Sequence, residues 1–280
     1  MQRLVVIAIL ASGAAFTASA EKAQAQTICC VDPNMRGYQA APPPEPEPYG
    51  GLRGYIGVEY AKSRLNPGTP SPRVEAWTAE GAVVTDFRGL GVQADIKAAK
   101  INGTGTTGDD WVTSPTLHIF KRNPYGALGA FAGFSNGDGG NLYAAGIEGQ
   151  ANMTGATLYG TLGFGRINDT VDSDLLAARL GGRYFLTENL RLDAAAGYVR
   201  QTAGAAKSEA MVYDIGAEYQ FGAFPASVQF GYRHAEARGS AIEADTLRVG
   251  LRWSFNGDTL AQRDRAGPSF SNVSDIFLSN

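Results

Sequence analysis

Charged side chains recur at alternate positions along segments whose other positions are apolar, and their chemistry is the most prominent in the chain. Arginine offers a planar fork of donors that matches carboxylate and phosphate groups, while Asp and Glu supply the opposite charge. Period-two spacing places them together on one face of extended segments. The candidates are Arg53, Glu59, Glu80, Asp95, Glu148, Arg179, Arg183, Arg191, Asp193, Asp214, Glu218, Arg233, Arg248 and Arg252. Such a mixed face predicts either a transverse field along a water-filled path or ion pairs that close an interior as a polar core.

The two histidines of the chain, His118 and His234, are the obvious candidates for acid–base chemistry. A hydrolytic pair needs a serine close to the imidazole. The nearest same-face neighbours of His118 are Thr116 and Phe120, and those of His234 are an aromatic and an acidic residue. We therefore expect two wall or rim histidines and no enzymatic activity.

Other functional motifs are missing from the sequence. The acidic stretches 109–110 and 169–174 lack the spacing of a calcium loop, and no zinc spacing or phosphate-cradling loop occurs. No basic run suits nucleic acid. The formal net charge of −3 and the pI near 5.5 favour no particular partner. We expect no cofactor, no metal and no nucleic acid.

The only cysteines, Cys29 and Cys30, are adjacent. They predict a strained vicinal disulfide or an intermolecular one in an oxidising compartment. Lipidation is the alternative, but the preceding Gln26, Thr27 and Ile28 depart from a lipoprotein box. A metal site has no nearby histidine to complete it.

The two ends of the chain differ in composition from its middle. Residues 1–25 have the order of a secretory signal peptide: a charge, a short apolar core and a small-residue stretch. Residues 26–50 form a lead whose proline-rich part, residues 41–49, predicts an extended spacer. A single glycine- and tyrosine-rich domain follows over residues 51–255, and residues 256–280 form a polar tail with scattered apolar residues.

The middle of the chain alternates apolar and polar residues in about twelve segments separated by turn signals. Long and short connections take turns, and residues 202–208 are expected to be one of the loops. Pro115 lies inside the fourth segment and predicts a bulge or register change. Residues 125–134 leave the face assignment open, because both faces are apolar or glycine.

The last segment has a face of apolar residues that ends on an aromatic. Its members are Leu247, Val249, Leu251, Trp253 and Phe255. This segment resembles the closing strand of Gram-negative bacterial outer-membrane β-barrels of the porin-like kind. The resemblance implies an all-β fold, a transmembrane antiparallel up-and-down barrel of about 12 strands in the cell outer membrane. It also implies that these five residues are an assembly signal for the barrel assembly machinery. One departure is that residues 256–280 follow the final aromatic.

The function expected from this resemblance is a passive channel. Many inward glycines and alanines would leave room in a lumen of about twelve strands, and the arginines favour small hydrophilic solutes of negative charge. The alternative is a non-conducting structural or adaptor barrel that acts through its loops or periplasmic ends. For the tail, residues 256–280, three outcomes stay open: a disordered end, a lumen plug, or a strand that docks on a periplasmic partner. The remaining expected partners are outer-membrane lipids.

Overall fold

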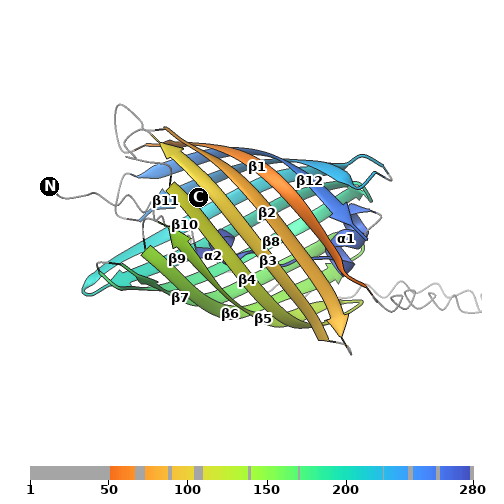
Figure 1. Ribbon diagram of the computed structural model, residues 1–280, viewed down its shortest axis with the longest axis horizontal. Coiled ribbons are helices and arrows are strands. Elements are labelled where there is room, and N and C mark those ends of the chain that lie inside the picture. The colour runs from red at the N-terminus through yellow and green to blue at the C-terminus, as the bar shows by residue number, and fades with distance from the viewer. Residues whose placement is uncertain are drawn as a thin grey trace, which may run out of the picture.

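The computed structural model describes residues 51–66, 73–87, 90–103, 110–137, 140–169, 171–222, 224–238, 242–256 and 259–277. The predicted signal peptide, the proline-rich lead and the Cys29–Cys30 pair lie outside these residues. Twelve strands are followed by two short helices (Figure 1). They are β1 (Arg53–Leu65), β2 (Arg73–Phe87), β3 (Leu90–Gly103), β4 (Asp110–Asn123), β5 (Gly126–Gly137), β6 (Gly140–Met153), β7 (Ala156–Asn168), β8 (Ser173–Thr187), β9 (Leu190–Ala203), β10 (Ala206–Gln220), β11 (Ala226–Ala237), β12 (Glu243–Phe255), α1 (Leu260–Ala266) and α2 (Val273–Phe277).

Each strand pairs antiparallel with its sequence neighbours, and β1 pairs with β12 to close the barrel. The closing register runs from Gly54 opposite Phe255 to Leu65 opposite Ala244. Closure leaves no unpaired sheet edge, which a barrel in lipid requires. The predicted fold class is therefore confirmed, with the strand count as expected. Among the described residues, neither helix has the length and hydropathy needed to cross a bilayer.

The two faces of the barrel wall have opposite character. Large apolar side chains such as Ile56, Val58 and Leu251 are exposed on the outside. Polar side chains such as Gln93 and His118 are fully buried on the inside. This inversion of the soluble pattern is what a lipid-facing exterior demands, because water lies on the inner side only.

The two ends of the barrel differ in their connections. The end that carries the tight turns after β2, β4, β6 and β8, together with the start of β1 and the end of β12, is called the short-turn end. Gly155 has φ +72° in the turn after β6, a conformation that side chains with a Cβ disfavour. The opposite end is called the loop end. The loop predicted over residues 202–208 is wrong, because β9 and β10 join there through a two-residue connection. The ladder extends into this polar stretch because strands that project past lipid no longer need apolar alternation.

Two local expectations from the sequence are resolved by the strand registers. No register shift occurs at Pro115: the β4–β5 pairs Thr113 with Asn136 and Thr116 with Gly133 follow one register on both sides of a short gap. Proline removes one donor from the ladder without adding a residue, so pairing is interrupted but not displaced. In β5, whose facing was ambiguous, Phe131 is buried and points inward.

Candidate functional site in the barrel lumen

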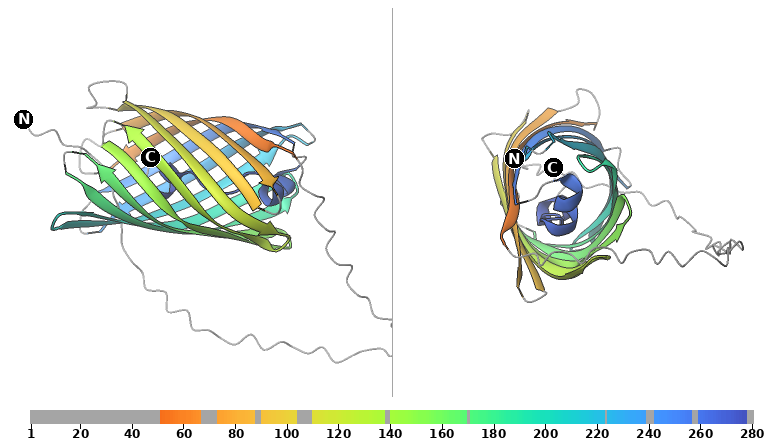
Figure 2. Two further views of the ribbon diagram at one scale, coloured as in Figure 1. Left: turned by 60° about the horizontal axis from the view of Figure 1, so that its bottom comes forward. Right: turned by 90° about the vertical axis from the view of Figure 1, so that its right-hand side faces the viewer.

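The chain does not end at the barrel wall but turns back into the lumen. Asn256 follows β12 with φ 55°, in the left-handed region that asparagine tolerates, and its side-chain amide donates to the carbonyl of Leu52 at 2.6 Å. The view along the barrel shows α1 and α2 inside the bore (Figure 2). We call residues 259–277 the C-terminal plug. Of the three outcomes open for the tail, the lumen plug is the one observed for these residues, and a disordered end is wrong for them.

The helix α1 is fixed at the short-turn end. Thr259 caps it by accepting from the backbone N–H of Gln262 at 3.2 Å. The backbone N–H of Ala261 donates to the carbonyl of Glu188 at 3.1 Å. From the wall, Arg122 donates to the carbonyl of Ala266 at 2.7 Å, which satisfies an orphan acceptor at the helix end. The tight turns of the barrel therefore hold the entrance of the plug.

Two charged residues of α1 pair with wall residues of opposite charge. Arg263 contacts Glu218 and Ser254. Asp264, whose side chain is fully buried, pairs with Arg183 at 2.5 Å and accepts from the hydroxyl of Thr157 at 2.7 Å. A buried charge is tolerated only when it is paired and hydrogen-bonded, and both conditions hold here.

Between the helices, polar backbone groups of the plug are matched by wall side chains. The Gln93 side chain accepts from the N–H of Ser269 and donates to the carbonyl of Phe270, both at 3.1 Å. The ring of Phe270 stacks on His118 with centroids 5.8 Å apart and meets Phe120 edge-on at 5.0 Å. The amide of Asn272 donates to the carbonyl of Ser114 at 2.7 Å.

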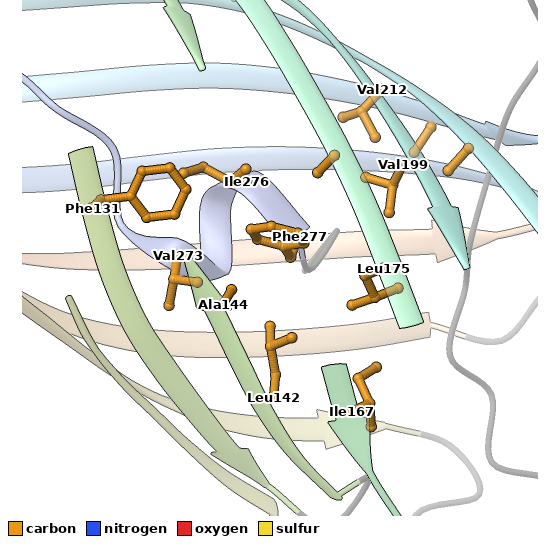
Figure 3. Close-up of a cluster of buried hydrophobic side chains, with 13 residues drawn as sticks. Phe131, Leu142, Ala144, Ile167, Leu175, Val199, Val212, Val273, Ile276 and Phe277 are labelled. Atoms are coloured by element: carbon orange, nitrogen blue, oxygen red, sulfur yellow. The ribbon is translucent and has the colours of Figure 1, made fainter. Parts of the chain in front are cut away.

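The helix α2 lies deeper along the bore and is mainly apolar. Val273, Ile276 and Phe277 are buried against an apolar patch of the lumen wall toward the loop end (Figure 3). The wall patch consists of Phe131, Leu142, Ala144, Ile167, Leu175, Ala177, Val199, Ala210, Val212 and Ala235. One ion pair accompanies these contacts, between Lys97 and Asp275 at 2.8 Å. An apolar patch on a lumen wall is costly when wet, so it indicates a fitted partner.

A polar cavity of about 190 Å³ remains between the plug and the wall. Its basic wall residues are Lys97, Arg179, Arg183, Arg191, Arg233, Arg248 and Arg252. Its acidic wall residues are Glu59, Glu80, Asp95, Asp193, Asp214 and Glu218. Arg263, Asp264 and Asp275 of the plug complete the lining. The wall alone thus contributes seven basic and six acidic groups.

Along this cavity, two carboxylates each contact three arginines. Asp214 receives Arg179 and Arg233 at 2.7 Å each and Arg248 at 3.0 Å. Around Glu218, Arg191 lies at 2.9 Å and Arg252 at 3.5 Å, beside Arg263 of the plug. Arg191 and Arg252 also pair with Asp193 and Glu80. The three guanidinium groups around Asp214 leave a local excess of positive charge, which attracts anions.

His118 belongs to a separate buried cluster beside the cavity. Its Nε2 lies 2.7 Å from Asp95 and its Nδ1 lies 2.7 Å from Glu148. Ionised carboxylates only accept hydrogen bonds, so two of them are satisfied when both ring nitrogens donate and the ring is an imidazolium. At the loop end, His234 pairs with Asp245 at 2.9 Å and stacks near Tyr213.

The outside of the barrel carries a continuous apolar surface with aromatic side chains toward both ends. Trp77, Trp111 and Tyr143 are exposed toward the loop end, and Tyr184 and Trp253 toward the short-turn end. Rings with a polar tip favour the two interfaces of a bilayer. The exterior therefore has the form expected of a lipid-facing band between two aromatic girdles.

Comparison with solved structures finds β-barrels of outer-membrane proteins. The NanC porin superposes with a TM-score of 0.53 at 9% identity, over 71% of this chain and 100% of that one. The translocator domain of autotransporter NalP from Neisseria meningitidis gives a TM-score of 0.49 at 17% identity, over 73% of this chain and 88% of that one. A loop-deletion mutant of OmpT, an outer membrane protein of Vibrio cholerae, gives a TM-score of 0.44 at 12% identity, over 74% of this chain and 100% of that one. The protein has the fold of an outer-membrane β-barrel. No family model and no curated protein matches its sequence.

The structure of this barrel places the charged residues singled out in the sequence. All of them except Arg53 and Glu148 line the cavity. Glu148 is buried against His118, and Arg53 lies at the start of β1. The interpretation as a polar core of ion pairs applies to much of the lumen, although arginine remains in excess around Asp214.

The apolar residues proposed as an assembly signal lie on the outer face of β12. Leu247, Val249, Leu251 and Trp253 are exposed, and Phe255 is half-buried. They occupy the strand that closes the barrel against β1. Their role in recognition by the assembly machinery stays a prediction.

The sequence did not identify the residues of the plug that enter the site, above all Arg263, Asp264, Asn272 and Asp275. The sequence of the wall does, however, indicate that an apolar partner fills part of the lumen. The alternation that turns Leu176 and Ala178 outward turns Leu175 and Ala177 inward, where an aqueous lumen would favour polar residues. Apolar residues at lumen positions call for an apolar partner, and the tail carries one in Val273, Ile276 and Phe277.

Proposed function

We propose that the barrel is a porin-like passive channel for small hydrophilic solutes of negative charge, and that the C-terminal plug closes it in the state described above. The observation that carries this proposal is the arginine excess along the polar cavity, centred on Asp214 with Arg179, Arg233 and Arg248. Basic groups that outnumber their carboxylates lower the free energy of an anion in a narrow path.

The proposal assigns the protein no catalytic role. Passive conduction requires a continuous path and weak binding along it, not a reacting group. Solutes enter by diffusion, the arginines select them by charge, and displacement of the plug widens the path.

A second candidate function is favoured by a different observation. The plug contacts strands around much of the barrel, through wall partners on opposite sides such as Ser114 on β4 and Glu218 on β10. Such broad contact suits a permanently closed barrel with a structural or adaptor role. A periplasmic partner that binds the tail would then have to compete with these lumen contacts.

Single-channel conductance in a planar bilayer separates the two candidates. The full chain is compared with the variant Val273→Asp/Phe277→Asp, which places two charges against the apolar wall patch and so unseats the plug without changing a strand. We expect low conductance from the native chain and steady, anion-selective conductance from the variant. Val171→Asp, at an exposed valine in the loop end, is the matched control and should behave as the native chain does.

Both outcomes are informative about the function. Conductance of the unseated variant with anion preference, read from the reversal potential under a salt gradient, supports the channel. A silent unseated variant that is correctly folded contradicts the channel and supports the structural barrel.

A further inference from the structure

We propose that Arg183 and Thr157 form a carboxylate-binding subsite of the lumen wall, and that the plug occupies it with Asp264 as an internal substitute for an anionic solute. This inference rests on the proposed channel function. It identifies the chemical group that the lumen recognises and explains why the plug and the solute exclude each other.

The geometry around Asp264 is that of a bound carboxylate. Arg183 contacts its Oδ1 and the hydroxyl of Thr157 donates to its Oδ2, so each oxygen has its own wall donor. Both donors belong to the barrel, on β8 and β7. A soluble carboxylate needs the same two partners, which remain on the wall when α1 moves away.

Two wall contacts restrain Arg183 in addition to its contacts with Asp264 and with the carbonyl of Ser269 in the plug. The guanidinium of Arg183 lies over the ring of Tyr159 at 4.7 Å from the centroid, and its Nε lies 3.8 Å from Asp193. These contacts restrict the long side chain before any ligand arrives, which lowers the entropy cost of binding. These two wall contacts do not depend on the plug and therefore favour the anion-binding position of Arg183.

A second acidic residue of the plug follows the same logic. Asp275 pairs with Lys97 on β3, whose amino group also lies 3.6 Å from Glu80. The plug thus brings two carboxylates and one guanidinium, Arg263, to the cavity. These three groups offset the single excess positive charge of the wall lining, seven basic against six acidic groups. A plug that neutralises the wall in this way competes with anionic solutes for it.

Chemical complementation with acetate tests the subsite in the full chain. Asp264→Ala removes the carboxylate and leaves its two wall donors facing a small vacancy. Acetate should refill that vacancy and strengthen plug docking, whereas acetamide, the neutral molecule of the same shape, should not. Docking is read, in an Arg265→Gln background that removes an exposed cleavage site, from the rate at which trypsin cleaves after Arg263, because Arg263 is buried when α1 is seated.

Rates are compared within one variant with and without additive, so that intrinsic cleavage preferences cancel. We expect at least a threefold slowing of tail release from Asp264→Ala by acetate at about 100 mM, which lies within the mM range of simple ligand affinities. No slowing is expected in Asp264→Ala/Arg183→Gln. Asp172→Ala, which removes an exposed carboxylate paired with Arg166, is the matched control and should not respond.

Equal effects of acetate and acetamide, or the same acetate effect after loss of Arg183, would overturn the inference. So would the absence of any acetate effect in Asp264→Ala. This experiment does not depend on conductance. A barrel that is silent when unseated but responds to acetate refutes the channel alone, and a conducting barrel without an acetate response refutes the subsite alone.

Discussion

Gly163 and Phe277 lie in such close contact that no residue larger than glycine fits at position 163. A Cβ atom at Gly163, on the inner face of β7, would lie 2.8 Å from Cζ of Phe277 and 2.9 Å from Cζ of Phe131. The wall of β7 is therefore shaped to receive the aromatic ring of α2. Because these residues lie far apart in sequence, this fit links the barrel to the tail that follows it.

Gly163→Val should unseat α2. The added methyl groups overpack the contact with Phe277, at a cost of about 1–3 kcal/mol. Faster trypsin release of the tail is the expected result. Gly160→Val on the same strand is the control, because a Cβ there makes ordinary contacts, with the outward Leu180 side chain at 3.7 Å and the carbonyl of Arg179 at 3.8 Å. Equal tail release from both variants would show that the Gly163 contact does not hold the plug.

Charge selectivity should respond in opposite directions to the two signs of charge in the lumen. In the unseated background Val273→Asp/Phe277→Asp, replacing Arg248 and Arg252 by Gln removes cations from the lumen and should reduce anion preference. Asp214→Asn removes the shared carboxylate of Arg179, Arg233 and Arg248 and should increase it. The reversal potential under a salt gradient measures both changes.

Arg166→Gln provides the reference for those measurements, because this arginine is exposed at the loop end and pairs with Asp172. It should leave the reversal potential nearly unchanged. A shift of the same sign from Asp214→Asn and from the arginine variants would contradict selection by lumen charge.

Acid should loosen the plug through Asp275. Burial opposes ionisation of Asp275, but the charge and hydrogen bond of Lys97 outweigh it and hold the pKa of this carboxyl below its ordinary value of 3.8. A lowered pKa in the docked state means that the ion pair stabilises docking above pH 3.8, and that this stabilisation is lost as the pH falls through the docked pKa. We therefore expect constant docking from pH 7 to about pH 5 and weaker docking below pH 4.

Hydrogen–deuterium exchange of the tail peptide, corrected for the intrinsic rate at each pH, measures this loss. Asp275→Asn should exchange faster than the native chain at pH 7 and show a smaller change on acidification. The remaining change is assigned to Asp264, whose pKa burial raises and the Arg183 charge lowers, with a net shift downward. Tail exchange that is independent of pH in both proteins would rule out this linkage.

The lipid-facing surface makes a separate prediction about stability. Val249 is exposed in the middle of β12, opposite Tyr60. Val249→Arg should reduce the free energy of unfolding in lipid by about 2–4 kcal/mol if it lies near the bilayer midplane. Urea titration of the barrel refolded in lipid vesicles gives this value, with Val249→Ile as the conservative control. An arginine tolerated at no cost would mean that this face does not contact lipid.

Much of the barrel could be predicted from the sequence because the face on which a side chain lies depends on its position along its own strand. Each strand turns apolar residues to lipid and polar residues to water, and side chains alternate along any strand, so Leu247 to Phe255 predicts its own faces. The same rule placed Glu80, Asp95, Arg183 and the other charged residues on the inner face. Where this local signal was weak, as in the polar stretch 202–208 and in β5, the prediction was wrong or left open.

Only the tertiary structure decided what occupies the lumen. The plug is held by residues distant in the chain: Arg183 lies 81 positions from Asp264, and Gln93 lies 177 positions from Phe270. No periodicity in a short polar tail encodes such partners, because they meet only after the barrel has closed. Closure is likewise what gathers Arg179, Arg233 and Arg248 around Asp214. The sequence determined which face each charge occupies, through the alternation of the strand, while the partner of each charge depended on the curvature of the closed sheet and the return of the chain into it.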